Sequence, residues 1–128
     1  MPRWNDYKSE AKSRGALAFE LYMVQSTPAG DPAAVKETLP DHLAYQAEQE
    51  AAGRLFLAGP ISDETGEMME GSGLIIYRAE SLEAAQELAE NDPMHARGAR
   101  SFVLRRWLIN EGGMSLTVRF SAQDVSLE

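Results

Sequence analysis

The sequence predicts an α+β fold of the split βαβ type, in which two helices cover one face of an antiparallel sheet. Four short apolar runs alternate with two segments of helical periodicity, in the order strand, helix, strand, strand, helix, strand. The chain of 128 residues is long enough to bury one core without a metal or a disulfide. Its composition is globular, since 44% of the residues are hydrophobic and 25% are charged.

The first half of the predicted core contains one strand and one helix. Residues 1–16 form a polar leader, and residues 17–24 follow as a strand with apolar residues on both faces. Residues 32–52 have a helical composition, but Pro40 lacks a backbone donor, so we expect the helix proper to restart there with Pro40 in its first turn. Gly53 is the expected stop of this helix.

Two short strands and a loop come next. Residues 54–58 predict a strand that is closed by Gly59 and Pro60, and residues 73–78 predict its neighbour. The segment between them, residues 61–72, carries four carboxylates and no basic residue, which is typical of a solvated loop.

The second helix and the fourth strand complete the core. Ser81 is a plausible N-cap, and the apolar stripe that follows it ends at Asp92 because the residue before Pro93 is pushed out of the α region. Residues 102–109 then predict the fourth strand.

A further strand is expected at the C-terminus. Residues 115–120 alternate apolar and polar side chains, and Gly112 and Gly113 before them allow a tight reversal. We therefore expect residues 115–120 to pair with residues 102–109. Three apolar side chains should then be less exposed than the three polar ones, that is, Leu116, Val118 and Phe120 less than Ser115, Thr117 and Arg119.

Together these elements make a ferredoxin-like sheet in a single domain of residues 1–128, with a core at 17–111 and a C-terminal strand and tail at 112–128. The helix-free face of this sheet is apolar on the first and fourth strands. A monomer rarely exposes so much apolar area, so we expect a homodimer that is joined through this face.

Composition excludes several classes of protein. The net charge is 12 − 20 = −8, which argues against nucleic-acid binding but leaves small molecules as ligands. The chain lacks an apolar stretch of the roughly 20 residues that a membrane span needs, and it lacks a secretory signal, so we expect a cytoplasmic protein. It contains no cysteine and no glycine-rich phosphate loop, and we assign no cofactor and no metal.

His42 and Asp92 are the candidate catalytic residues. At about 100° per residue His42 falls within about 20° of Val35, so it points toward the sheet, and in a first turn after Pro40 the helix dipole would keep its ring neutral. Asp92 could accept a proton from one imidazole nitrogen and leave the other nitrogen as a base. Alternatively, the pair only ties two helices together, or Asp92 caps the donors near Pro93.

Three residues are candidates for substrate binding: His95, Arg106 and Tyr22. His95 follows Asp92 by three residues and could be a second acid or base, or a metal ligand, although a partly exposed histidine on a turn is the plainer alternative. An inward-pointing arginine could hold a carboxylate or phenolate, and the alternative is an ion pair with a helix carboxylate or a dimer partner. Four arginines fall within ten residues: Arg97, Arg100, Arg105 and Arg106. Tyr22 could stack on a ring or fill the core.

Several short motifs resemble the YCII-related family. They are the stretches at 41–45 (DHLAY), 53–55 (GRL), 58–60 (AGP) and 91–93 (NDP), together with Arg106-Trp107. The resemblance implies a dimeric α/β barrel, a His and Asp pair in a cleft, and kinship with small enzymes that eliminate or isomerise ring compounds. Pro40 just before the histidine and His95 after the Asp-Pro pair depart from the family pattern.

Two function classes fit these residues. In the first, a small enzyme without a cofactor uses His42 to move a proton in the elimination, isomerisation or hydrolysis of a small cyclic or carbonyl compound. In the second, the same dimer is a ligand-binding or regulatory module without chemistry. A His42 ring bonded to protein at both nitrogens would favour the second class, and an open nitrogen that faces a cavity would favour the first.

Overall fold

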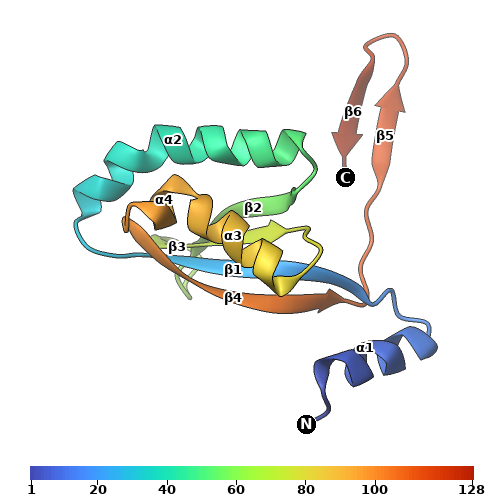
Figure 1. The fold of residues 1–128 in the computed structure, drawn as a ribbon. Helices are drawn as coiled ribbons and strands as arrows, with labels where there is room; N and C mark the ends of the chain where they lie inside the picture. Colours follow the sequence, from blue (N-terminus) through green and yellow to red (C-terminus); the bar gives the residue numbers. More distant parts are fainter. The chain divides into compact units, whose positions relative to one another are not determined.

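The structure, a computed structural model, describes residues 1–128, which divide into two compact units: residues 20–107, and residues 1–19 together with 108–128. The predicted α+β fold with a four-stranded antiparallel sheet is confirmed, and the strand order is β2-β3-β1-β4 (Figure 1). The strands are β1 (Phe19–Pro28), β2 (Leu55–Ser62), β3 (Met69–Tyr77) and β4 (Arg100–Ile109). The helices α2 (Pro32–Ala51), α3 (Leu82–Asn91) and α4 (Pro93–Ala96) lie over one face of this sheet (Figure 1).

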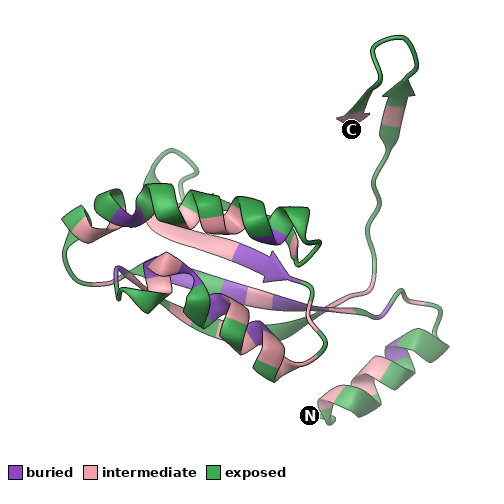
Figure 2. Cartoon of the chain, turned by 45° about the horizontal axis from the view of Figure 1, so that its top comes forward, coloured by how far each residue is buried: buried purple, intermediate pink, exposed green.

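The core lies between the sheet and the helices. Val24 on β1 is in register with Ile75 on β3, and Tyr22 is in register with Tyr77, so these side chains point to the same face. Buried residues are concentrated along the two central strands and on the inward sides of the helices (Figure 2). Two alanines of α3, Ala85 and Ala89, pack on this face, and their small side chains let the helix approach the strands closely.

The predicted helix ends are confirmed. The Ser81 side chain caps α3 by accepting a hydrogen bond from the amide of Ala84 at 3.0 Å. After α2, Gly53 has a φ of +79° and donates its N–H to the carbonyl of Glu50 at 3.0 Å. None of the helices is both long enough and apolar enough to cross a bilayer.

The expectation that a helix restarts at Pro40 is wrong, because α2 runs unbroken from Pro32 to Ala51. Proline removes one intrahelical hydrogen bond, but Thr38 before it and Gln49 after it are both buried, so packing holds both halves in one helix. The Pro40 ring itself is exposed, and the helix changes direction along its length (Figure 1). His42 therefore lies in the middle of a helix, and the argument from a helix dipole at its first turn fails.

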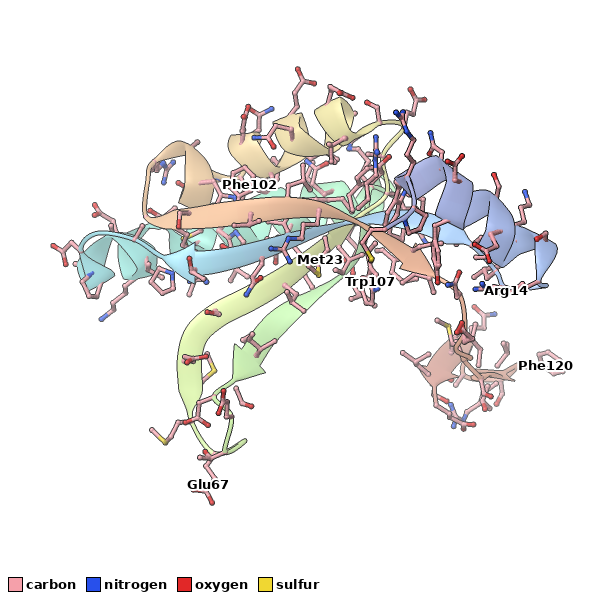
Figure 3. All side chains as sticks on the ribbon, turned by 90° about the horizontal axis from the view of Figure 1, so that it is seen from below. Arg14, Met23, Glu67, Phe102, Trp107 and Phe120 are labelled. Atoms are coloured by element: carbon pink, nitrogen blue, oxygen red, sulfur yellow. The ribbon has the colours of Figure 1, made fainter.

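The β2–β3 hairpin is longer than predicted. Gly59 and Pro60 lie inside β2 rather than after it, and β3 already begins at Met69. Proline fits here because β2 is an edge strand, where its missing N–H leaves no ladder bond unmade. As a result the predicted loop of residues 61–72 shrinks to the tip around Glu67, where the hairpin projects beyond the other two strands (Figure 3).

The C-terminal segment forms a separate hairpin, which corrects the predicted pairing of residues 115–120 with residues 102–109. β5 (Leu116–Arg119) pairs with β6 (Asp124–Leu127) in a two-stranded sheet of its own. Pairing with β6 is favoured over pairing with β4, because closing the short loop between β5 and β6 costs less entropy. The expected burial of the apolar side chains is also wrong. Leu116, Val118 and Phe120 are 60%, 61% and 91% exposed.

The residues predicted as a polar leader contain the helix α1 (Trp4–Ser13). After it, Ala18 takes a φ of +50°, and the amide of Leu17 donates to the carbonyl of Asn110 at 3.0 Å.

Of the two glycines with positive φ in the β2–β3 hairpin, Gly71 should tolerate substitution by alanine less well than Gly66. An alanine Cβ at Gly71 would meet Pro28 Cγ at 2.9 Å, whereas at Gly66 it would meet nothing within 4 Å. We expect Gly71→Ala to lower the free energy of unfolding by about 2–3 kcal/mol, and Gly66→Ala, which carries only the strain of its φ, by about 1 kcal/mol. Urea unfolding of both variants measures the difference, and equal losses would contradict the close contact.

Candidate functional site

A histidine and a buried carboxylate from two helices form the centre of the candidate site. His42 Nδ1 lies 2.8 Å from Asp92 Oδ1 and 2.9 Å from Oδ2, although the residues are 50 positions apart. The carboxylate oxygens accept, so Nδ1 carries a hydrogen, and in the neutral ring the lone pair is then on Nε2. His42 makes no hydrogen bond through Nε2, and its side chain is 15% exposed at the wall of a cavity.

The local chain fixes the position of Asp92. This residue ends α3 and begins α4, whose first residue is Pro93, and its side chain is completely buried. Oδ1 also accepts the amide of Met94 at 3.0 Å. The two alternatives for Asp92, a cap and a partner of His42, are therefore true together, and the turn holds the carboxylate where the histidine needs it.

The cavity beside His42 has a volume of about 700 Å³, which is in the range of small-molecule sites. One wall is the apolar side of α2. The strands β2 and β3 contribute backbone at three glycines together with apolar side chains that include Met69 and Leu74. Val35, Leu39 and Leu43 line the cavity from α2, and the three glycines of the strands are Gly59, Gly71 and Gly73. This mostly apolar lining suits an apolar ring with few polar groups.

Two polar residues that sequence reasoning did not assign also line this cavity: Ser26 and Arg100. The sequence placed Arg100 in a cluster of four arginines, of which only Arg106 was assigned to binding. Ser26 was missed because the first strand was expected to end at residue 24. Since β1 continues to Pro28, strand alternation places Ser26 on the same face as Val24.

His95 lies close by but is bonded to protein at both nitrogens. Nδ1 donates to the carbonyl of Ala89 at 2.7 Å, and Nε2 lies 2.8 Å from Ser26 Oγ. Burial lowers the pKa of His95, so the ring is neutral and Nε2 accepts the hydroxyl hydrogen. His95 does not line the cavity, and no group of three His, Asp or Glu side chains is placed to hold a metal ion.

The other two predicted binding residues, Tyr22 and Arg106, are not brought to the cavity. The hydroxyl of Tyr22 donates to Glu20 Oε2 at 3.2 Å, and Arg106 Nε lies 3.9 Å from Glu20 Oε1. Glu20 is near the beginning of β1, whereas the cavity residue Ser26 is near its end. Burial raises the pKa of Tyr22, so its phenol stays protonated.

The chain is similar to proteins of known family and structure. Residues 19–108 match the YCII-related domain. The uncharacterized protein YjpA of Bacillus subtilis (strain 168) is 30% identical over 76 residues, which cover 59% of this chain and 82% of YjpA. A solved structure of 5-chloro-2-hydroxyhydroquinone dehydrochlorinase (TftG) from Burkholderia phenoliruptrix AC1100, in complex with 2,5-dihydroxybenzoquinone, matches with a TM-score of 0.56 and 25% identity. The match covers 68% of this chain and 92% of TftG.

His95 should titrate below the ordinary histidine pKa of 6.5. The unfolded chain then binds more protons than the folded chain at acid pH, so the free energy of unfolding should fall as the pH drops below about 6.5. NMR titration of the imidazole signals measures this directly, and His95→Gln assigns them because the chain has only two histidines. The same variant should show a weaker loss of stability at acid pH. A His95 signal that titrates at or above 6.5 would contradict the neutral ring.

Proposed function

The chain belongs to the YCII-related family, and on that premise we propose that it is a small enzyme that uses His42 and Asp92 for acid–base chemistry on a small cyclic compound. The observation that carries the proposal is the free Nε2 of His42 at the cavity, with Nδ1 held by a buried carboxylate. Of the two function classes, this open nitrogen favours the enzyme over a module that only binds.

The reaction best suited to this pair is elimination or isomerisation of a hydroxylated ring. In an elimination, His42 Nε2 takes a proton from the substrate, the freed electron pair becomes a new double bond, and a leaving anion departs with the pair of its own broken bond. In an isomerisation, the same nitrogen returns the proton at another atom. Neither step needs a cofactor, because the imidazole of His42 can both accept and donate the proton.

Asp92 has two effects on this base. It fixes the tautomer, since only the form with hydrogen on Nδ1 satisfies the carboxylate. It also stabilises the imidazolium that forms once Nε2 is protonated, and this effect is strong because the carboxylate is fully buried. Asp92 thus acts through His42 rather than on the substrate.

The size and mostly apolar lining of the cavity support a cyclic substrate. The structural neighbour TftG acts on a chlorinated hydroxyhydroquinone and was solved with a dihydroxybenzoquinone. The cavity of about 700 Å³ between α2 and the strands β2 and β3 is large enough for a six-membered ring of this kind. We therefore take 5-chloro-2-hydroxyhydroquinone as the first test substrate.

Replacing His42 should remove the chemistry and keep the binding. With this substrate, His42→Gln should lower chloride release by about 10²–10⁴-fold, the usual contribution of a general base. The matched control is Arg97→Gln, which alters an exposed ion pair with Asp41 at 2.8 Å and should leave the rate unchanged. Titration with 2,5-dihydroxybenzoquinone should show binding to both variants. Full activity in His42→Gln would refute the proposal, and binding without turnover by the unaltered protein would favour the ligand-binding module.

We further infer that the protein is a homodimer joined through the helix-free face of the sheet. Phe102 and Leu104 pack against the core, so the alternating residues Val103 and Trp107 point the other way, and they are 53% and 43% exposed. Figure 3, which views the molecule from below, shows Met23 and Trp107 on this side. A second copy would cover these side chains.

Sedimentation equilibrium tests the dimer. The protein should have twice the chain mass of 14.1 kDa at micromolar concentration, and Val103→Glu should shift it to the monomer, because a charge would be buried in the interface. Val118→Glu is the matched control, since Val118 is 61% exposed but lies on the separate hairpin. A monomeric unaltered protein, or dissociation by Val118→Glu alone, would contradict the use of this face.

A further inference from the structure

Arg100, at the start of β4, is the one lysine or arginine that lines the cavity. Its Nε donates to Ser26 Oγ at 2.8 Å, and its Nη2 donates to the backbone carbonyls of Ser26 and Gly71. All these acceptors are uncharged. The guanidinium forms no ion pair, and Nη1 makes no hydrogen bond. A half-buried cation is thus held at the cavity, and its Nη1 is available for a hydrogen bond to a ligand.

Neither of the two carboxylates near Arg100 forms an ion pair with it. Asp92 is bonded to His42, and Asp31, which also lines the cavity, accepts the amide of Ala33 at 3.0 Å as the N-cap of α2. Burial lowers the pKa of Arg100, but an arginine remains charged at neutral pH. Asp92 stabilises this charge through space but makes no direct ion pair with it, so a ligand anion in contact with the half-buried guanidinium would gain more than at an exposed arginine.

A directed series of hydrogen bonds orients the guanidinium. Ser26 Oγ accepts from Arg100 Nε, so its own hydrogen is free to go to His95 Nε2, and His95 Nδ1 in turn donates to the carbonyl of Ala89. This order requires a neutral His95, because a protonated ring has no lone pair on Nε2. Ser26 and His95 are therefore positioning residues for Arg100, and this gives His95 a role behind the cavity wall.

We propose that Arg100 binds an anionic oxygen of the ligand, so that the cavity selects planar compounds in their phenolate, enolate or carboxylate form. His42 reaches the cavity from α2, and Arg100 reaches it from the sheet. A ligand between them would present an ionised oxygen to Arg100 and a transferable proton to His42. The inference rests on the proposed function for the identity of this site, but it concerns binding and needs no turnover.

4-Nitrophenol is a direct probe, because it ionises near neutral pH and its phenolate absorbs visible light. The pKa of the bound phenol should be lower than that of the free phenol by about one unit in the unaltered protein, as for an acid beside an opposite charge. Arg100→Gln should abolish the shift. Arg100→Lys should retain part of it, because the charge remains while the fork geometry is lost. Arg97→Gln is the matched control and should keep the whole shift, since Arg97 does not line the cavity.

The unaltered protein alone provides a second test, which does not depend on whether a variant folds. At a pH above the pKa of the phenol, it should bind 4-nitrophenolate about tenfold more tightly than 4-nitroanisole, the neutral methyl ether, which corresponds to the same one-unit shift. Equal affinities, or an undiminished shift in Arg100→Gln, would overturn the inference. A shift lost in His42→Gln but kept in Arg100→Gln would overturn it too, because the histidine would then be the anion site. Loss of turnover with the anion preference intact would refute only the proposed reaction.

Discussion

The completely buried carboxylate of Asp92 is the constraint on which the rest of the site depends. It joins three helices, because it ends α3, caps α4 through Met94 and bonds to His42 on α2. A buried carboxylate must have its oxygens satisfied, so the positions of these helices are coupled. A second link, from the hydroxyl of Tyr45 to the carbonyl of Leu88 at 2.7 Å, keeps α2 and α3 together along their length. The proposed base is therefore placed by the same interactions that hold the helical layer.

The sequence predicted the order of the elements and the contact between His42 and Asp92, because both follow from local signals. The Ser81 cap, the Gly53 stop and the Asp92-Pro93 break each specify a chain end on their own. The last of these signals places Asp92 at the end of its helix, and the helical repeat of about 100° per residue places His42 on the same, inward side of its helix as Val35. The pairing across 50 residues then follows from the split βαβ arrangement.

The errors at the two prolines share one physical cause, which is that tertiary context outweighs a local signal. Pro40 does not break α2, because buried residues on both sides hold the helix. Pro60 does not end β2, because an edge strand tolerates a missing donor. Ser26 was missed because the polar end of β1 gives no strand signal of its own. Arg100 was not singled out because it precedes the strand predicted at residues 102–109, whereas β4 begins at Arg100 itself. The C-terminal apolar residues were assigned to the larger sheet, although a nearer partner strand was available.

The double use of Asp92 also limits how this scaffold can change. At many functional sites a substitution that weakens activity strengthens the fold, because the site is strained. In the proposed enzyme one carboxylate would serve both activity and fold, so changes at Asp92 would lower both properties at once and offer no gradual path to another chemistry. The α2 residues that line the cavity differ from Asp92 in this respect. Leu39 and Leu43 are 44% and 53% exposed and contribute little to the packing of the core. Evolution or engineering toward new ligands should therefore vary these residues and leave the His42–Asp92 pair fixed.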